Sequence, residues 1–187
     1  MGIGGIIFLA VVAALIFAVV AAYNKLVSLR QRSEEAWSDI DVQLKRRTDL
    51  VPNLVETVRG YAGHERTTLE QVIRARGAAV SAPTPEARAQ AENALTGALR
   101  QLFALAESYP QLKANESFQQ LQASLAEIEG HIQDSRRYYN AVVRDLNTTI
   151  DSVPTNFIAS FFRFAKRAYF ELDSPEDRQV PRVSFGS

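Results

Sequence analysis

The chain contains no cysteine among its 187 residues. This absence excludes disulfide bonds, iron–sulfur clusters, thiolate zinc sites and cysteine nucleophiles. Histidine is also scarce, because His64 and His131 are the only two and lack the paired spacing of a histidine-rich metal site. We therefore expect no metal and no other cofactor.

Patterns that support catalysis are missing as well. His64 and Glu65 begin like a zinc-protease motif, but no second histidine follows at the required position. The glycines form no phosphate-binding loop, and no nucleophile stands beside a base. We predict no catalytic residues and no enzyme activity, and a His64→Ala variant would test the remaining alternative, a hydrolase that uses His64.

Charge of either sign is not in excess, because 21 Lys and Arg residues balance 21 Asp and Glu residues. A neutral chain lacks the positive field that attracts nucleic acid, so we expect no nucleic-acid partner. Hydrophobic residues make up 47% of the chain. This content is sufficient for one domain with a packed core.

A long apolar run opens the chain. Residues 1–24 carry no charged side chain, and the 20 residues 3–22 are almost entirely apolar. As a helix, 20 residues extend roughly 30 Å, which matches the hydrocarbon core of a bilayer. A cleaved signal peptide is the rival interpretation, but the basic n-region is missing and the apolar run is too long. We predict a retained transmembrane anchor over residues 1–24.

The residues that follow this anchor predict its orientation. Lys25, Arg30 and Arg32 come directly after the span, whereas no basic side chain precedes it. Positive residues favour the cytoplasmic side. We therefore expect a single-pass protein of the inner (cytoplasmic) membrane, with the remainder of the chain in the cytoplasm.

Helical spacing dominates the rest of the chain. Between residues 37 and 61, seam positions are separated alternately by three and four residues, with Arg47 as the polar exception. Pro52 lies inside this seam without disturbing its phase, so we favour one long, kinked helix ending near Gly77 over a break at Thr48 or Asp49.

Two further helices are predicted, over residues 85–108 and from about residue 116 to residue 153. Thr84 and Asn115 are placed to cap them. Short connections require antiparallel neighbours. The predicted fold is all-α, an N-terminal transmembrane helix followed by an elongated antiparallel three- to four-helix bundle over residues 25–172, with a mobile C-terminal tail over residues 173–187.

One polar group on the first long helix is a candidate interaction face for a protein partner. Its members are Asp41, Lys45, Arg47, Asp49, Asn53 and Glu56. Arg47 would be buried by its seam position, unless its side chain reaches out to solvent. A buried arginine needs an acid from another helix, such as Glu129 or Asp134, or from another chain, and it would then fix register or partner choice.

The last apolar segment, residues 156–170, combines aromatic residues with cations and predicts a short helix. The residues that suggest a membrane-interface helix are Phe157, Phe161, Phe162, Arg163, Lys166 and Arg167. Alternatively, the aromatic side chains cap the open end of the bundle while the cations face water. The sequence does not decide between these two interpretations.

Three stretches carry a family resemblance. They are EEAWSDIDVQLKRRTDLVPNLVETVRGYAGHE over residues 34–65, YPQLKANESFQQLQ over residues 109–122 and RRYYNAVVRDLN over residues 136–147. The chain strongly resembles the LemA family of bacterial proteins. The resemblance implies an N-terminal membrane segment and a helical bundle, and it brings no enzyme activity, metal or cofactor. A similar protein is implicated in building magnetosome membranes, which suggests a membrane-organising role by analogy alone.

Two functional hypotheses follow. In the first, the protein is a non-catalytic scaffold of the LemA type, anchored in the lipid bilayer, that self-associates as a homo-oligomer and organises or remodels the membrane. In the second, it is a monomeric, membrane-tethered adaptor for another membrane protein, such as a protease or a sensor. The sequence does not identify such a partner.

Overall fold

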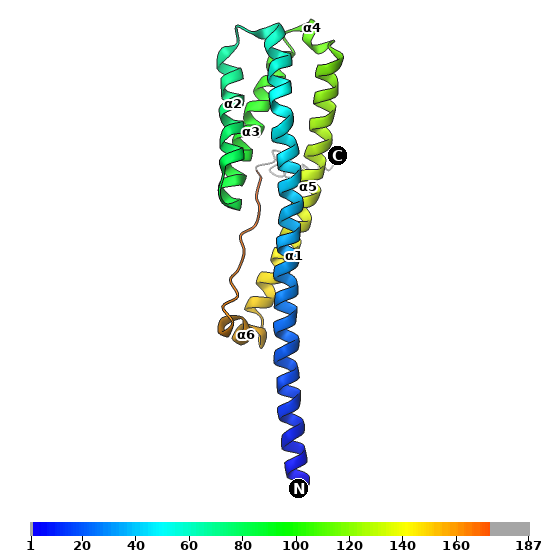
Figure 1. Ribbon diagram of the computed structural model, residues 1–187, viewed down its shortest axis with the longest axis vertical. Coiled ribbons are helices and arrows are strands. Elements are labelled where there is room, and N and C mark those ends of the chain that lie inside the picture. Colours follow the sequence, from blue (N-terminus) through cyan, green and yellow to red (C-terminus); the bar gives the residue numbers. More distant parts are fainter. Residues whose placement is uncertain (1, 173–187) are drawn as a thin grey trace, which may run out of the picture. The chain divides into compact units, whose positions relative to one another are not determined.

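The computed structural model describes residues 2–172, so the predicted mobile tail lies outside the described residues. All regular elements within this range are helices, which confirms the all-α prediction (Figure 1). They are α1 (Ile3–Ala62), α2 (Arg66–Ser81), α3 (Pro85–Ala106), α4 (Pro110–Lys113), α5 (Glu116–Asp151) and α6 (Thr155–Phe161). The described chain forms two compact units, which we call the anchor unit (residues 2–42 and 132–169) and the bundle unit (residues 43–131 and 170–172).

The bundle unit packs four helical segments around one core. The segment of α1 from residue 43, then α2, α3 and the segment of α5 up to residue 131 alternate in direction, as predicted for short connections (Figure 1). The core is built from the apolar faces of these helices, and its most buried members include Val51, Leu54, Val58, Val72, Leu95, Leu102 and Leu112.

The predicted seam of α1 is confirmed over most of its length. Ile40, Leu44, Val51, Leu54 and Val58 are fully buried, as their three- and four-residue spacing requires. Tyr61, the last predicted member, is exposed. Heptad spacing thus identified the buried face of α1 correctly up to its last turn.

The prediction of one helix continuing to Gly77 is wrong, because α1 ends at Ala62 and α2 begins at Arg66. A side chain at Gly63 would bring a Cβ atom to 3.0 Å from the carbonyl oxygen of Arg59. Glycine therefore allows the chain to leave the helix here. Apolar spacing did not reveal the turn, because both flanking segments are helical.

Pro52 lies inside α1, as predicted, and the helix continues through it. Proline has no N–H group, so the carbonyl four residues earlier, that of Thr48, loses its helical donor. The Nε atom of Arg76, from α2, donates to this carbonyl at 2.7 Å. A side chain from a neighbouring helix thus replaces the hydrogen bond that proline removes.

The two predicted helix caps are present. The hydroxyl oxygen of Thr84 accepts from the backbone amide of Ala87 at 3.2 Å at the start of α3, and the side-chain Oδ1 of Asn115 accepts from the backbone amide of Phe118 at 2.9 Å at the start of α5. The short helix α4 was not predicted; it occupies the connection between α3 and α5 and begins at Pro110.

In the anchor unit, α1 and α5 form an antiparallel pair. Leu26 is buried in one cluster with Leu146, whereas the ring of Trp37 lies 5.7 Å from that of Tyr139. As the residue number rises along α1, the number of its partner on α5 falls, so the two helices run in opposite directions. Helix α1 also extends beyond this pair, over the apolar stretch predicted as the anchor.

Among residues 2–172, α1 is the one helix long and apolar enough to cross a membrane, and none of its most apolar stretch is buried. The exposed apolar side chains there include Ile6, Phe8, Leu15, Ile16 and Phe17. A surface of this kind is unfavourable in water and favourable in lipid.

The predicted helix over residues 156–170 is wrong beyond Phe161, where α6 ends. The backbone after Phe162 follows α5 without regular structure. Asn147 holds it by two hydrogen bonds of 2.9 Å, one to the amide and one to the carbonyl of Arg167. The Tyr139 hydroxyl donates to the carbonyl of Ala168. Long-range partners thus take the backbone groups that a helix would have used.

Candidate functional site

The first candidate site is the aromatic end of the anchor unit, which we define as residues 153–164. A small core fixes its position, because Leu26, Leu146 and Ala159 are buried together and Ile158 and Phe164 pack against them. One side of α6 therefore covers the end of the pair formed by α1 and α5. This part of the capping interpretation agrees with the structure.

The opposite side of the aromatic end faces outward. Phe161 is 80% exposed, Val153 75% and Phe157 69%. Phe162 is also exposed and packs edge-to-face against Phe161, with ring centroids 5.0 Å apart. A single exposed apolar residue is normal on a protein surface, but a contiguous group of them usually marks an interaction site.

Tyr23 joins this aromatic end to the apolar stretch of α1. Its ring centroid lies 4.7 Å from that of Phe162 and 5.8 Å from that of Phe164. Tyr23 directly follows the 20 apolar residues, at the position where aromatic side chains favour the boundary between lipid and water. The exposed phenylalanines therefore lie beside the end of the apolar stretch.

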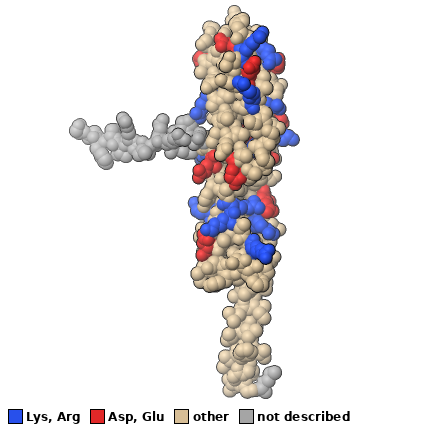
Figure 2. Space-filling model, turned by 90° about the vertical axis from the view of Figure 1, so that its left-hand side faces the viewer, with Lys and Arg blue, Asp and Glu red and all other residues tan. Residues whose placement is uncertain are grey.

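Cations lie close to this aromatic end. The guanidinium carbon of Arg30 lies 5.5 Å from the ring centre of Phe164, a cation–π contact. Lys166 pairs with Asp151 at 2.6 Å and Arg167 with Glu34 at 2.7 Å. Figure 2 shows Lys and Arg gathered in a belt above the narrow uncharged helix, with a zone free of charged residues between them.

Arg163 has an unusual backbone at the end of α6. Its φ of 58° is in the left-handed region, where glycine is the usual residue. The Phe164 amide donates to the Ala159 carbonyl at 2.9 Å, and the Arg163 amide donates to the Ser160 carbonyl at 3.2 Å. These two bonds define a Schellman motif, which stops the helix and presents the exposed Arg163 side chain at its carboxyl end.

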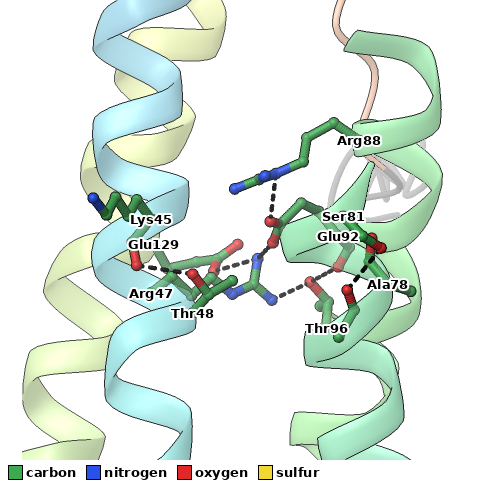
Figure 3. Close-up of polar contacts among 10 residues, drawn as sticks. Lys45, Arg47, Thr48, Ala78, Ser81, Arg88, Glu92, Thr96 and Glu129 are labelled. Carbon is green, nitrogen blue, oxygen red and sulfur yellow. Dashed lines mark hydrogen bonds and ion pairs between the residues drawn. The ribbon is translucent and has the colours of Figure 1, made fainter. Parts of the chain in front are cut away.

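The second candidate site is the charged interior of the bundle unit, shown in Figure 3. Arg47 is only 2% exposed, and its Nη1 atom lies 3.4 Å from Glu92 Oε2 and 3.5 Å from Glu129 Oε2. Its Nη2 atom donates to the hydroxyl of Thr96. The expected partner Glu129 is confirmed, whereas Asp134 pairs with Arg137 instead.

Glu92 was missed by the sequence analysis, although it is fully buried. Arg88 Nε donates to Glu92 Oε1 at 3.1 Å, so two arginines flank this carboxylate. Burial raises the pKa of the Glu92 carboxyl, and Arg47 and Arg88 oppose that rise. Arg88, Glu92 and Thr96 are four residues apart on α3, a spacing that puts them on one helix face.

The candidate interaction face does not include Arg47. Asp41, Lys45, Asp49, Asn53 and Glu56 are exposed, as a surface for a partner requires. Arg47 points into the core and pairs within its own chain. The prediction that this arginine could select a second chain therefore loses its basis.

His64 and His131 are both exposed, and Glu127 is the acidic neighbour of His131, at 3.7 Å. Within residues 2–172, no group of three or more His, Asp or Glu side chains is placed to hold a metal ion.

Comparisons with known proteins place the chain among related sequences. The LemA family pattern matches residues 36–185. Magnetosome protein MamQ 2 of Paramagnetospirillum magneticum is 24% identical over 195 residues, covering 90% of this chain and 72% of the relative. Magnetosome protein MamQ of Magnetospirillum gryphiswaldense is 24% identical over 184 residues, covering 84% and 68%. Protein LemA of Metamycoplasma hominis is 26% identical over 164 residues, covering 86% and 74%.

Proposed function

The chain belongs to the LemA family, and on that premise we propose that it is a membrane-anchored helical scaffold that performs no catalysis. The observation that carries this proposal is the apolar stretch of α1, which no other part of the described chain buries. The same helix then continues into the packed cores of both units. Insertion of this stretch into lipid would fix the folded region to a membrane.

The proposed orientation rests on the cations that follow the apolar stretch. Lys25, Arg30 and Arg32 favour the cytoplasmic side of an inner membrane. A reporter fused to the C-terminus should be active only in the cytoplasm. Activity solely on the opposite side would reverse the proposed orientation while leaving the anchor itself intact.

Self-association is the more specific part of the proposal. Two relatives are named magnetosome proteins, and we extend to this chain a role in organising a membrane. The apolar stretch supports assembly, because Gly4 and Gly5 have no neighbouring side chains in the structure and small residues let membrane helices approach closely. Arg47 contributes nothing to assembly in this scheme, since its partners are internal.

The decisive measurement is the particle mass of the full-length protein in mild detergent, by light scattering with lipid and detergent subtracted. A scaffold predicts a uniform particle containing many copies. Ala10, Ala14 and Ala18 are small residues at four-residue spacing, so they share one face of the apolar helix. Replacing all three by Leu would put bulky side chains on this face and should reduce the copy number. A monomer for the unmodified protein would contradict self-association.

The second candidate function, a monomeric adaptor, is favoured by the exposed polar face of α1. Lys45, Asp49, Asn53 and Glu56 are available to a different membrane protein. A photo-crosslinker placed at Asn53 should then capture one defined partner in cells. The matched control is a crosslinker at Gln71, an exposed position on α2. Equal patterns from the two positions would argue against an adaptor face.

A further inference from the structure

We propose that the aromatic end of the anchor unit is a second membrane contact, which places its phenylalanines in the bilayer interface and binds anionic phospholipid headgroups through Arg30, Arg163 and Lys166. This inference rests on the proposed membrane anchoring, since the anchor determines where the bilayer lies. It assigns a ligand class and specific residues to a surface that anchoring alone does not require.

The depth of this surface follows from Tyr23. The 20 apolar residues 3–22 cover roughly 30 Å as a helix, so Tyr23 lies at the edge of the hydrocarbon core. Phe162 contacts the Tyr23 ring at a centroid distance of 4.7 Å. The exposed rings of Phe157 and Phe161 belong to the same short helix, and they lie within reach of the same boundary.

The charge of this surface selects the lipid. Within the described residues, Lys25, Arg30 and Arg163 have no acidic side chain within ion-pair distance, and Lys166 meets a single acid, Asp151. Anionic headgroups would supply the missing negative charge. Apolar side chains next to a rim of cations are the usual composition of a membrane-interface surface.

Arg163 provides the sharpest indication. A non-glycine residue in the left-handed region is strained, yet this position holds an exposed arginine where glycine would fit the Schellman motif better. Within residues 2–172, the Arg163 side chain forms no hydrogen bond or ion pair that would compensate for the strain. We infer that the compensation comes from a phosphate group outside the chain.

The first experiment measures depth, and it benefits from the absence of cysteine, because one introduced thiol can be labelled alone. Full-length Phe161→Cys carries a nitroxide in vesicles of phosphatidylcholine with phosphatidylglycerol, and accessibility to oxygen and to a water-soluble nickel complex is compared. Tyr138→Cys, an exposed position on α5 in the same unit, is the aqueous control. Phe17→Cys reports on the anchor.

The inference predicts that the label at Phe161 favours oxygen, as the label at Phe17 does, whereas the label at Tyr138 favours the nickel complex. Equal nickel accessibility at Phe161 and Tyr138, with Phe17 in lipid, overturns the inference and leaves the anchoring intact. Low accessibility to both reagents at Phe161 overturns it too, since a protein partner then covers the surface. A water-exposed label at Phe17 contradicts the anchoring itself.

The second experiment measures lipid selectivity. The full-length protein is extracted from vesicles of phosphatidylethanolamine and phosphatidylglycerol, and the lipids that remain bound are quantified by mass spectrometry. Phosphatidylglycerol should be enriched over its share in the vesicles. Removal of each cation, in Arg30→Gln, Arg163→Gly or Lys166→Gln, should weaken this preference by about fivefold.

Arg163→Gly separates lipid binding from folding. Glycine relieves the backbone strain, so the variant should melt at an equal or higher temperature while it binds less phosphatidylglycerol. The control removes three exposed cations of the bundle unit, by Arg59→Gln, Arg74→Gln and Arg100→Gln, and should keep the enrichment. Unchanged enrichment in Arg163→Gly, or an equal loss in the control, overturns the proposal.

Discussion

The two units of this protein depart from the ordinary pattern of a water-soluble domain in opposite ways. The bundle unit encloses charge, since Arg47 and Glu92 are both almost completely buried. The anchor unit exposes apolar side chains, both along the apolar stretch of α1 and at Phe157 and Phe161. Each departure is unfavourable in free energy, and favourable interactions with a partner group must offset it.

The two units differ in where these partner groups lie. In the bundle unit the partners are internal, because Glu92, Glu129 and Thr96 surround the Arg47 guanidinium. In the anchor unit, none of the most apolar stretch of α1 is buried by described residues. A lipid bilayer is the external partner that the proposed function assigns to this stretch. The bundle unit thus supplies partners for Arg47 from its own chain, whereas the proposed partner of the apolar stretch is external.

The most severe way to break this contrast is to introduce charge into the apolar stretch. Val12→Asp with Ile16→Asp should prevent stable insertion, because one charge at the centre of a membrane helix costs about 2.5–3.5 kcal/mol and two cost about 5–7 kcal/mol. The protein should leave the membrane fraction after an alkaline wash. Val12→Leu with Ile16→Leu should remain there, and persistence of the charged variant would refute a transmembrane role.

The converse change makes the bundle interior apolar. Arg47→Met removes the cation beside Glu129 and one of the two arginines that flank Glu92. It should lower the free energy of unfolding by about 3 kcal/mol, measured by chemical denaturation in detergent. Replacing Glu92 by Met in the same chain should recover much of the loss. Arg46→Met, an exposed neighbour on α1, should change stability by no more than about 0.5 kcal/mol. A loss of the same size at both positions would refute the internal pairing.

A smaller effect is expected where α1 and α2 share the hydrogen bond between Arg76 and Thr48. Arg76→Met leaves the Thr48 carbonyl without a donor and should cost about 1–3 kcal/mol. The alanine amide in Pro52→Ala can donate to that carbonyl, so the cost of Arg76→Met should shrink in this background. A double-mutant cycle measures the difference, and Arg74→Met is the exposed control. Additive costs would show that Arg76 does not replace the missing helical bond.

The smallest expected effect is a pH dependence of stability that comes from the buried carboxyl group of Glu92. Burial raises the folded-state pKa of Glu92 above its ordinary value of 4.5, so the folded protein binds this proton more tightly than the unfolded chain. The corresponding stabilisation is fully present below pH 4.5 and is lost as the pH rises through the raised pKa.

The variant Glu92→Gln lacks this ionisation. The melting temperature of the unmodified protein minus that of Glu92→Gln should therefore decrease as the pH rises from 4.5 towards neutrality. Glu70→Gln, at an exposed position on α2, should leave the pH profile unchanged. Parallel profiles for the unmodified protein and Glu92→Gln would show that the ionisation of Glu92 has no net effect on stability.

Several features could be predicted because they depend on neighbours in sequence. Seam spacing located the buried face of α1, and the polar exception at Arg47 pointed correctly to Glu129. The caps at Thr84 and Asn115 are likewise local. The four-residue spacing of Arg88, Glu92 and Thr96 is also a local signal for the charged interior, because it puts three polar side chains on one face of α3.

Other features depended on partners that the sequence does not place. The end of α6 was misjudged because residues beyond Phe162 bind the side chains of Asn147 and Tyr139, which precede them by about twenty or more positions. The break after Ala62 was missed because two consecutive helices preserve the same apolar period. No local pattern distinguishes these cases from a continuous helix.

The sequence by itself determined the all-α composition, the length of the apolar stretch and most of the buried face of α1. Composition and helical periodicity act over a few turns, so no tertiary information is required for them. Only the tertiary structure decided that Arg47 is paired within its own chain, that Arg76 donates to the carbonyl freed by Pro52, and that the Phe162 ring lies beside Tyr23. These contacts join residues far apart in sequence, and packing of the whole chain is what brings them together.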